Sequence, residues 1–264
     1  MIYTCYEMIR DCRAGRAEGW RYLVCNYVPV IRKTLVHYGN ATSGTDAAVE
    51  QVLRALRLPG SNLFELMEPA PERSFVAELR QQILAGMDAA GGAVGIELEA
   101  LGTALESLTL VEKQAVWLET MRYPPAETGV LLRMDSATVE KIRGRAAGLI
   151  RGAVDSWSQT ILVDNGRALA LEAVAAQGPE CLPAKPFLDL LDGRTSWSGR
   201  EQLERHVTRC WNCIDYFCRL VEVTELLRGN QPLSEAEAAP FLNALGFQPE
   251  PRSAWKRWFG GAGS

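Results

Sequence analysis

The segment that decides the fold reads His206-Val-Thr-Arg-Cys210-Trp-Asn-Cys213, and Cys181 lies upstream of it. Zinc prefers thiolate and imidazole ligands in a tetrahedral arrangement, and short Cys/His intervals bring two ligands to one ion. His206 and Cys210 are four residues apart, so on a helix they would share a face. A site with four protein ligands has no open position for a substrate. The pattern therefore predicts one structural Zn²⁺ bound by Cys181, His206, Cys210 and Cys213.

The remaining cysteines have a different interpretation. Buried thiols behave as small apolar residues, and we assign that role to Cys5, Cys12, Cys25 and Cys218. The interval between Cys181 and His206 leaves room for a helix, and residues 200–206 are expected to form the later turns of the helix that carries His206.

Composition restricts the class of protein. The chain has 264 residues, 47% of them hydrophobic, and a net charge of −4. This length suggests one to three small domains, and the acidic balance means that any contact with nucleic acid needs a local basic face. Seven cysteines without a signal peptide indicate a reducing cytoplasm. No apolar stretch is long enough to span a bilayer, so we expect a soluble cytoplasmic protein.

The sequence carries no pattern typical of an enzyme. It has neither a phosphate-binding loop ending in Gly-Lys-Ser/Thr nor a Gly-x-Ser-x-Gly motif. Of its two histidines, His206 is assigned to zinc, and His37 is interpreted as a satisfied histidine at a helix end. We therefore expect a protein that is not an enzyme.

Apolar residues recur at three- and four-residue spacing along most of the chain, which predicts an all-α fold. A first helical domain is expected over residues 1–88, with helices at 9–12, 20–35, 46–58 and 72–87, followed by a linker within 86–95. A helix-turn-helix domain is expected over 96–157, a connector over 158–180 and a zinc-binding domain over 181–228. Residues 229–264 should form a short helix, for which Ser234 and Glu237 provide a capping box, and a flexible tail.

The second domain has the pattern of a helix-turn-helix. Pro124 and Pro125 can start its middle helix, Gly129 would let the following helix cross closely, and Asp135 is a candidate N-cap for that helix. Its inward stripe is expected to be Val139, Ile142, Ala146 and Leu149. A helix that presents polar and basic residues from its N-terminal half suits the major groove of DNA. The candidate DNA-binding residues are Ser136, Thr138, Lys141, Arg143 and Arg145, and the alternative is a three-helix bundle whose basic residues are merely solvated.

The zinc-binding segment resembles the zinc-binding domain of bacterial anti-sigma factors. The similarity covers about residues 181–228: a leading Cys181, a short helix ending in Asp192-Gly193, a second helix ending in His206-x-x-x-Cys210, and Cys213 nearby. It implies a small helical unit that grips a sigma factor and, in some members, responds to oxidants.

The preceding domain resembles region four of sigma factors of the extracytoplasmic-function type. The matching positions are Leu108, Glu127, Leu132, Thr138-Val139 and Arg145-Ala146. Two positions differ from the family: Thr128 replaces a residue that is usually apolar, and Glu140 replaces a residue that is often basic. By the same resemblance the first domain corresponds to region two, with residues 46–56 as a polymerase-docking helix. In that family, region two captures flipped, unpaired DNA bases with aromatic and basic residues. Here the candidates for this role are only Phe64, Arg73, Phe75 and Arg80. An ordinary helical bundle that cannot melt a promoter is therefore an equally weighted alternative for the first domain.

Together the resemblances imply a regulator of transcription initiation. Its helix-turn-helix would bind promoter DNA, its first domain would engage the RNA polymerase core, and its zinc domain would restrain both in cis by covering the sigma-like surfaces. The alternative is a degenerate sigma-like interaction module, acting as an anti-sigma factor or redox sensor. Such a module would bind another sigma factor or polymerase rather than promoter DNA.

Overall fold

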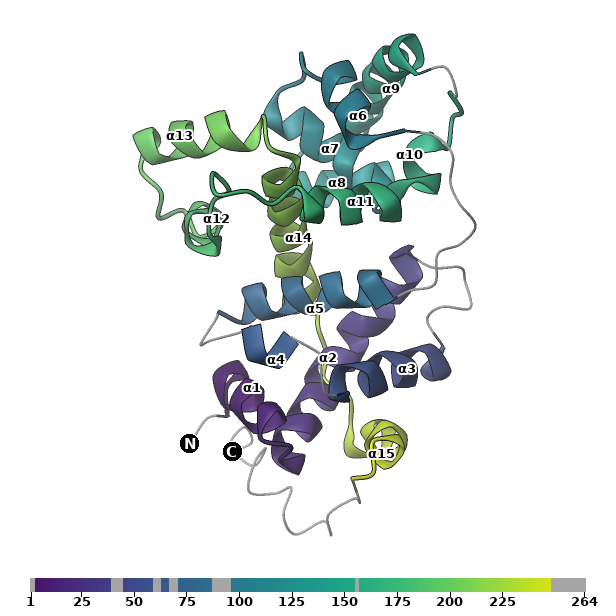
Figure 1. The fold of residues 1–264 in the computed structure, drawn as a ribbon, viewed down its shortest axis with the longest axis vertical. Coiled ribbons are helices and arrows are strands. Elements are labelled where there is room, and N and C mark those ends of the chain that lie inside the picture. Colours follow the sequence, from purple (N-terminus) through teal and green to yellow (C-terminus); the bar gives the residue numbers. More distant parts are fainter. Residues whose placement is uncertain are drawn as a thin grey trace. The chain divides into compact units, whose positions relative to one another are not determined.

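The computed structural model describes residues 3–38, 45–58, 63–66, 71–86, 96–154 and 157–247, and within these ranges all regular secondary structure is helical (Figure 1). The predicted all-α fold is confirmed for these residues. The chain divides into two compact units, residues 1–86 with 227–264, and residues 87–226. The expected helix-turn-helix and nearly all of the expected zinc-binding segment fall within the second unit. Residues 87–95 of the expected linker and the tail beyond residue 247 lie outside the described residues.

The first unit is built around one long helix, α2 (Ala17–Tyr38), against which the other longer helices of the unit pack. These helices are α1 (Cys5–Arg13), α3 (Asp46–Arg57), α5 (Glu72–Gly86) and α15 (Glu235–Ala244), while the short α4 (Leu63–Leu66) packs on α1 and α5. Aromatic side chains fill the space between them: the rings of Trp20 and Phe64 lie 5.5 Å apart, as do those of Tyr27 and Phe75. Such pairs of aromatic rings stabilise a core beyond the area that they bury.

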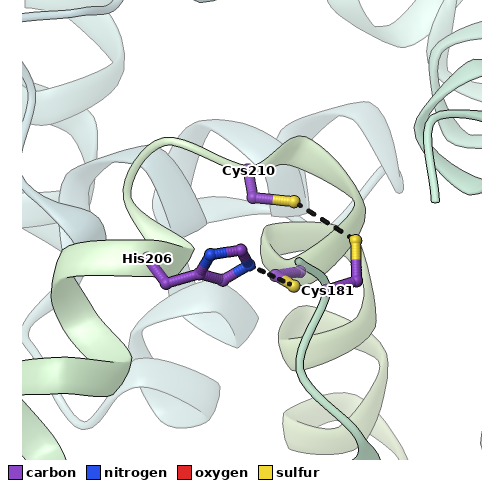
Figure 2. A group of neighbouring side chains, drawn as sticks. Cys181, His206 and Cys210 are labelled. Carbon is purple, nitrogen blue, oxygen red and sulfur yellow. Dashed lines mark hydrogen bonds between the residues drawn. The ribbon is translucent and has the colours of Figure 1, made fainter. Parts of the chain in front are cut away.

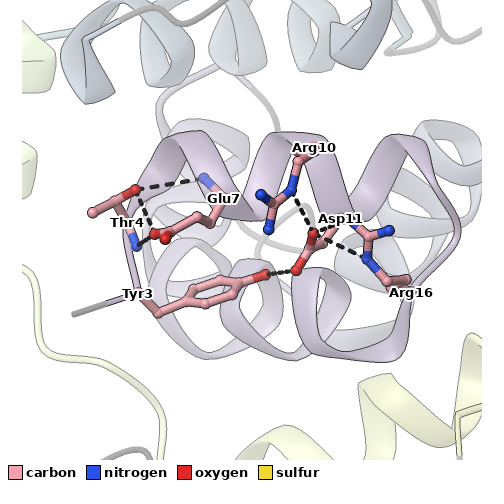
Figure 3. Close-up of polar contacts among 6 residues, drawn as sticks. All are labelled: Tyr3, Thr4, Glu7, Arg10, Asp11 and Arg16. Atoms are coloured by element: carbon pink, nitrogen blue, oxygen red, sulfur yellow. Dashed lines mark hydrogen bonds and ion pairs between the residues drawn. The ribbon is translucent and has the colours of Figure 1, made fainter. Parts of the chain in front are cut away.

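Helix α1 begins earlier than residue 9, where the apolar spacing had predicted it. Thr4 and Glu7 form a capping box that satisfies free N–H groups of the first turn. Near the other end, the buried Asp11 accepts hydrogen bonds from Tyr3, Arg10 and Arg16 (Figure 3). Burial alone would raise the pKa of the Asp11 carboxyl, but these three donors hold its pKa below the usual value. The ionised carboxylate therefore fixes the N-terminal segment and the α1–α2 turn.

Pro29 lies inside α2 and explains how the chain following α14 attaches to this unit. Proline has no N–H, so the carbonyl four residues earlier, that of Cys25, loses its partner within the helix. The N–H of Leu233 donates to this carbonyl at 2.8 Å, and the amide of Asn230 donates to the next carbonyl, that of Asn26. Helix α15 then begins at the Ser234–Glu237 capping box, as predicted from the sequence.

The second unit is centred on α7 (Leu110–Thr120), where four consecutive residues, Ala115 to Leu118, are fully buried. The other helices are α6 (Leu98–Ala104), α8 (Pro125–Leu132), α9 (Ser136–Ala153), α10 (Ile161–Asp164), α11 (Gly166–Ala175), α12 (Ala184–Leu191), α13 (Trp197–Val207) and α14 (Trp211–Arg228). Helices α8, α9, α10 and α11 all pack on α7. A Cβ at Gly166 would lie 2.0 Å from the carbonyl oxygen of Thr120, so α11 can start against the end of α7 only because this residue is glycine.

Helices α7, α8 and α9 have the local features predicted for a helix-turn-helix. Pro125 is the first residue of α8, and the Asp135 side chain caps α9 by accepting from the N–H of Thr138 at 2.8 Å. A Cβ at Gly129 would lie 2.6 Å from the Met134 carbonyl oxygen, so the turn between α8 and α9 requires glycine there. Val139, Ile142 and Ala146 are buried as expected, whereas Leu149 is only half-buried and Ile150 fills the core instead.

Candidate metal centre

Three side chains from residues 206–213 and one from Cys181, well upstream, converge beside the start of α14. The ligand atoms of Cys181, His206, Cys210 and Cys213 all lie within 4.8 Å of one another. Figure 2 shows the His206 ring and the Cys210 and Cys181 thiols turned toward the same point. The predicted grouping of these four residues is confirmed, and it makes a Cys₃His set that could hold a metal ion.

The local fold explains how each ligand reaches this point. His206 lies in the last turn of α13, which Ser196 caps at its N-terminus, and Cys213 lies in the first turn of α14. Cys181 comes from a turn before α12, closed by a hydrogen bond from its own N–H to the Gly178 carbonyl. The short helix and the His206-bearing helix predicted between Cys181 and Cys210 are present as α12 and α13.

One detail of the prediction is wrong. His206 and Cys210 do not share a helical face, because α13 ends at Val207 and Cys210 lies in the turn that follows. The N–H of Cys210 donates to the Val207 carbonyl, and the Cys210 carbonyl accepts from Ile214 in α14. A reversal between two helices therefore brings these two ligands together.

The spacing fits a tetrahedral zinc site. With zinc–sulfur bonds of about 2.3 Å, two thiolates of such a site lie about 3.8 Å apart, and the sulfurs of Cys181 and Cys210 are 3.7 Å apart. A zinc-bound imidazole nitrogen lies about 3.6 Å from a thiolate. The Nε2 of His206 is 3.1 Å from the Cys213 sulfur, so a bound ion requires this pair to separate by only about 0.5 Å.

Backbone N–H groups point at all three sulfurs. Gly178 donates to Cys181 at 3.3 Å, Cys213 donates to Cys210, and Leu182 donates to Cys213. Hydrogen bonds of this kind favour the thiolate over the thiol. Burial acts in the other direction: it raises the pKa of Cys210 and raises the pKa of Cys213 to about 12. Without a cation the balance favours the protonated thiols, so a bound cation would be needed to stabilise the thiolates.

Helix α14 connects the Cys₃His set to helix α7 through a buried polar contact that we call the α14–α7 joint. It consists of Asp215, Arg219 and Glu222 of α14, with Trp117 of α7 and Tyr123 after it. Asp215 accepts from the Trp117 indole at 3.0 Å and from Arg219 at 2.8 Å, and the Tyr123 hydroxyl donates to Glu222. All five side chains are 5% exposed or less.

This joint was not predicted from the sequence. A signal for it was present, since residues 215, 219 and 222 are spaced so that they share one face of a helix. Acidic and basic residues on one face of an otherwise apolar helix suggest a buried pair as readily as a solvated stripe. Only the partners on α7 separate the two interpretations.

The expectation that Arg143 faces outward is wrong. Its guanidinium donates to the carbonyls of Ala115 and Tyr123 and to the Thr128 hydroxyl at 2.8 Å. It also lies 3.5 Å from the Glu119 carboxylate, and its side chain is only 12% exposed. Residue 143 is four positions after Val139 on α9 and therefore shares its inward face. The buried Thr128 thus supplies a hydroxyl oxygen that accepts from Arg143.

The other candidate DNA-binding residues lie nearer the surface. Ser136 and Lys141 are exposed, and the Thr138 hydroxyl donates to the capping Asp135. Arg145 is half exposed and forms an ion pair with Glu112 of α7. The structure therefore leaves Ser136 and Lys141 as the candidates with open access to a ligand.

No helix among the described residues is long and apolar enough to cross a membrane. The chain was also compared with protein-family models, with curated proteins and with solved structures, and none of them matches it.

Proposed function

We propose that Cys181, His206, Cys210 and Cys213 bind one structural Zn²⁺. The observation that carries this proposal is the convergence of three sulfurs and one imidazole within 4.8 Å of one another, each sulfur receiving a backbone N–H. Four protein ligands leave no coordination position for a substrate, so the ion would be structural rather than catalytic. It would hold α13 and the turn before α12 against the first turn of α14.

We propose further that the chain regulates transcription initiation. The support is the helix-turn-helix arrangement of α7–α9, the resemblance of its sequence to region four of sigma factors, and the attached Cys₃His unit. In this proposal α9 approaches promoter DNA with Ser136 and Lys141, and the first unit engages the RNA polymerase core. Arg143 has no direct part in DNA binding because its guanidinium holds α9 to α7 and α8.

Restraint by the zinc-bearing helix would act through the α14–α7 joint. The contacts that join Asp215 to Trp117 and Glu222 to Tyr123 lie on α7 and the turn after it, not on the exposed N-terminal half of α9. Helix α14 would therefore fix the position of α7 within the unit rather than cover the DNA-facing residues. Such restraint differs from covering of the DNA-facing residues by the zinc-binding segment. A variant that weakens the α14–α7 joint should therefore change transcription activity although the DNA-facing residues are unaltered.

The burial of Arg143 favours a second candidate function. With Arg143 buried, Arg145 paired with Glu112 and Glu140 exposed on α9, the basic character of this helix is low. A phosphate-binding surface depends on cations that are free to replace counterions. The same fold would then serve as an interaction module that binds another sigma factor or polymerase instead of promoter DNA.

The two functions can be separated with the full-length chain. Removal of all residues after 178 would expose Trp117 and Tyr123, so point variants are preferable. We expect wild type to bind promoter DNA in the presence of core polymerase, and Lys141→Ala to weaken this binding and flatten its salt dependence. Lys185→Ala, a change of an exposed lysine on α12, is the control.

Equal DNA binding by the Lys141→Ala and control variants would remove the groove-binding role of α9. Stable capture of a purified sigma factor, without any retained DNA, would establish the interaction module instead. Cobalt substitution tests the metal separately, because tetrahedral Co²⁺ bound to thiolates gives intense visible absorption. Cys210→Ser should abolish that spectrum and Cys218→Ala should not.

A further inference from the structure

An open cavity of about 570 Å³ lies beside the turn that carries Cys210. Its walls come from α6, α7, α11 and the turn at residues 208–211, so it is formed entirely within the second unit. The cavity does not include any of the four Cys₃His residues. It is therefore a separate feature, although Thr208, Arg209 and Trp211 are neighbours of those ligands in sequence.

Lys113 is the most buried of the charged residues that line this cavity. The residue is only 5% exposed, and its ammonium donates one hydrogen bond, to the Thr208 carbonyl at 2.9 Å. Among the described residues no carboxylate lies within ion-pair distance of it. Burial lowers the pKa of Lys113, while the negative charge of Glu106 opposes that shift. An ammonium has three N–H groups, so Lys113 can donate further hydrogen bonds to an anion in the cavity.

Trp211 supplies a flat wall next to this ammonium. The Lys113 nitrogen lies 5.8 Å from the centre of the Trp211 ring. A Cβ at Gly102 would lie 2.9 Å from the indole nitrogen, so the close approach of the ring to α6 requires glycine there. The ring also packs on Trp117, with centroids 5.1 Å apart, and offers an apolar surface to a ligand.

The charged residues of the cavity fall into two groups. Lys113 and Arg209 lie toward the turn, whereas Glu99 and Glu106 belong to α6 and the residues after it. The third acidic residue, Glu172, is already engaged, since both its oxygens lie 3.2 Å from the N–H of Leu98. A ligand with charges of both signs would match this division, whereas a simple anion would be repelled by the glutamates.

We propose that this cavity binds a small zwitterion of the amino-acid class. Its carboxylate would be held by Lys113 and Arg209, its ammonium by Glu106 and Glu99, and its side chain would pack on Trp211. Removing a charge-assisted hydrogen bond of this kind lowers affinity by about ten- to a hundredfold. The proposal does not depend on zinc or on DNA binding, because none of its residues is a ligand or an exposed residue of α9.

The test is calorimetric titration of the full-length protein with each free amino acid, up to about 10 mM, the range of weak small-molecule binding. Amino acids that bind are repeated as their N-acetyl and carboxamide derivatives. We expect at least one free amino acid to bind, and both blocked forms to bind at least about tenfold more weakly. Lys113→Met should abolish binding, and Lys185→Met should bind like wild type.

Glu106→Gln provides a second variant, because Glu106 is exposed and its replacement should leave the fold intact. It should remove the preference for the free over the N-acetylated form. The proposal is overturned if no amino acid binds to the wild type, if blocked and free forms bind equally, or if Glu106→Gln keeps the full preference. A folded Lys113→Met variant that binds like wild type would also overturn it.

Discussion

The α14–α7 joint makes a quantitative prediction, because two pairs in this unit share a four-residue spacing but differ in burial. Arg219 and Asp215 are 2.8 Å apart and almost fully buried, whereas Arg200 and Glu204 are 2.7 Å apart and about half exposed. Removing one partner of a buried pair costs about 3–5 kcal/mol because the other charge stays in the interior. Removing one partner of an exposed pair costs about 0.5 kcal/mol.

We therefore expect Asp215→Ala to reduce the free energy of unfolding by about 4 kcal/mol, part of which comes from the Trp117 indole that loses its acceptor. This is a large share of the 5–15 kcal/mol typical of a folded domain. Glu204→Ala is the matched control and should cost about 0.5 kcal/mol. The measurement is denaturant unfolding at saturating zinc, following the transition that shifts when zinc is removed.

A double variant separates the charge from the packing. Replacing both members of a buried ion pair by apolar residues is often nearly neutral, so Asp215→Leu with Arg219→Met should be about 2 kcal/mol more stable than Asp215→Ala. If Asp215→Ala costs no more than Glu204→Ala, the joint is not a buried electrostatic contact. If the double variant loses as much unfolding free energy as the two single variants together, packing rather than charge dominates the joint.

Three further predictions concern other positions. In Cys210→Ser, elemental analysis should find bound zinc reduced from one ion per chain to a small fraction. The second unit should also lose stability, because metal binding to the folded state adds directly to its stability. Retention of stoichiometric zinc would contradict the proposed site. Arg143→Met should cost about 2–3 kcal/mol of stability, since it leaves buried carbonyls without donors; a variant of unchanged stability and reduced DNA binding would return Arg143 to the DNA-facing set. Burial lowers the pKa of His37 to about 4, so the unfolded chain binds a proton that the folded chain does not between about pH 6.5 and pH 4. Stability should therefore fall by about 2–3 kcal/mol as the pH drops through this window, and His37→Gln should flatten that part of the pH profile.

Local patterns predicted much of this structure because their causes act over a few residues. The capping residues Asp135 and Ser234 bond to N–H groups three positions ahead, and Gly129 is required by a turn of its own segment. Helical spacing likewise identified α3 and α5 to within one or two residues. The pattern underestimated α1, because Thr4 and Glu7 begin that helix before its first strongly apolar residues.

The direction of Arg143 illustrates what such patterns do not decide. The sequence shows that Arg143 and Val139 share a face of α9. Basic residues are usually solvated, however, and the sequence does not show that one hydroxyl and two carbonyl groups in the core can accept hydrogen bonds from Arg143. Burial of an arginine is tolerable only where partners replace its water. Those partners lie 15 to 28 residues away in the chain.

The sequence by itself determined the helical class and the four residues of the Cys₃His set, because residue type and short intervals limit which side chains can meet around one ion. The tertiary structure alone decided that the helix beginning at this set joins α7 through Asp215 and Glu222, and that a cavity opens beside Lys113. Trp117 and Asp215 are 98 positions apart. Contacts over such separations depend on how whole helices pack, which no local spacing records.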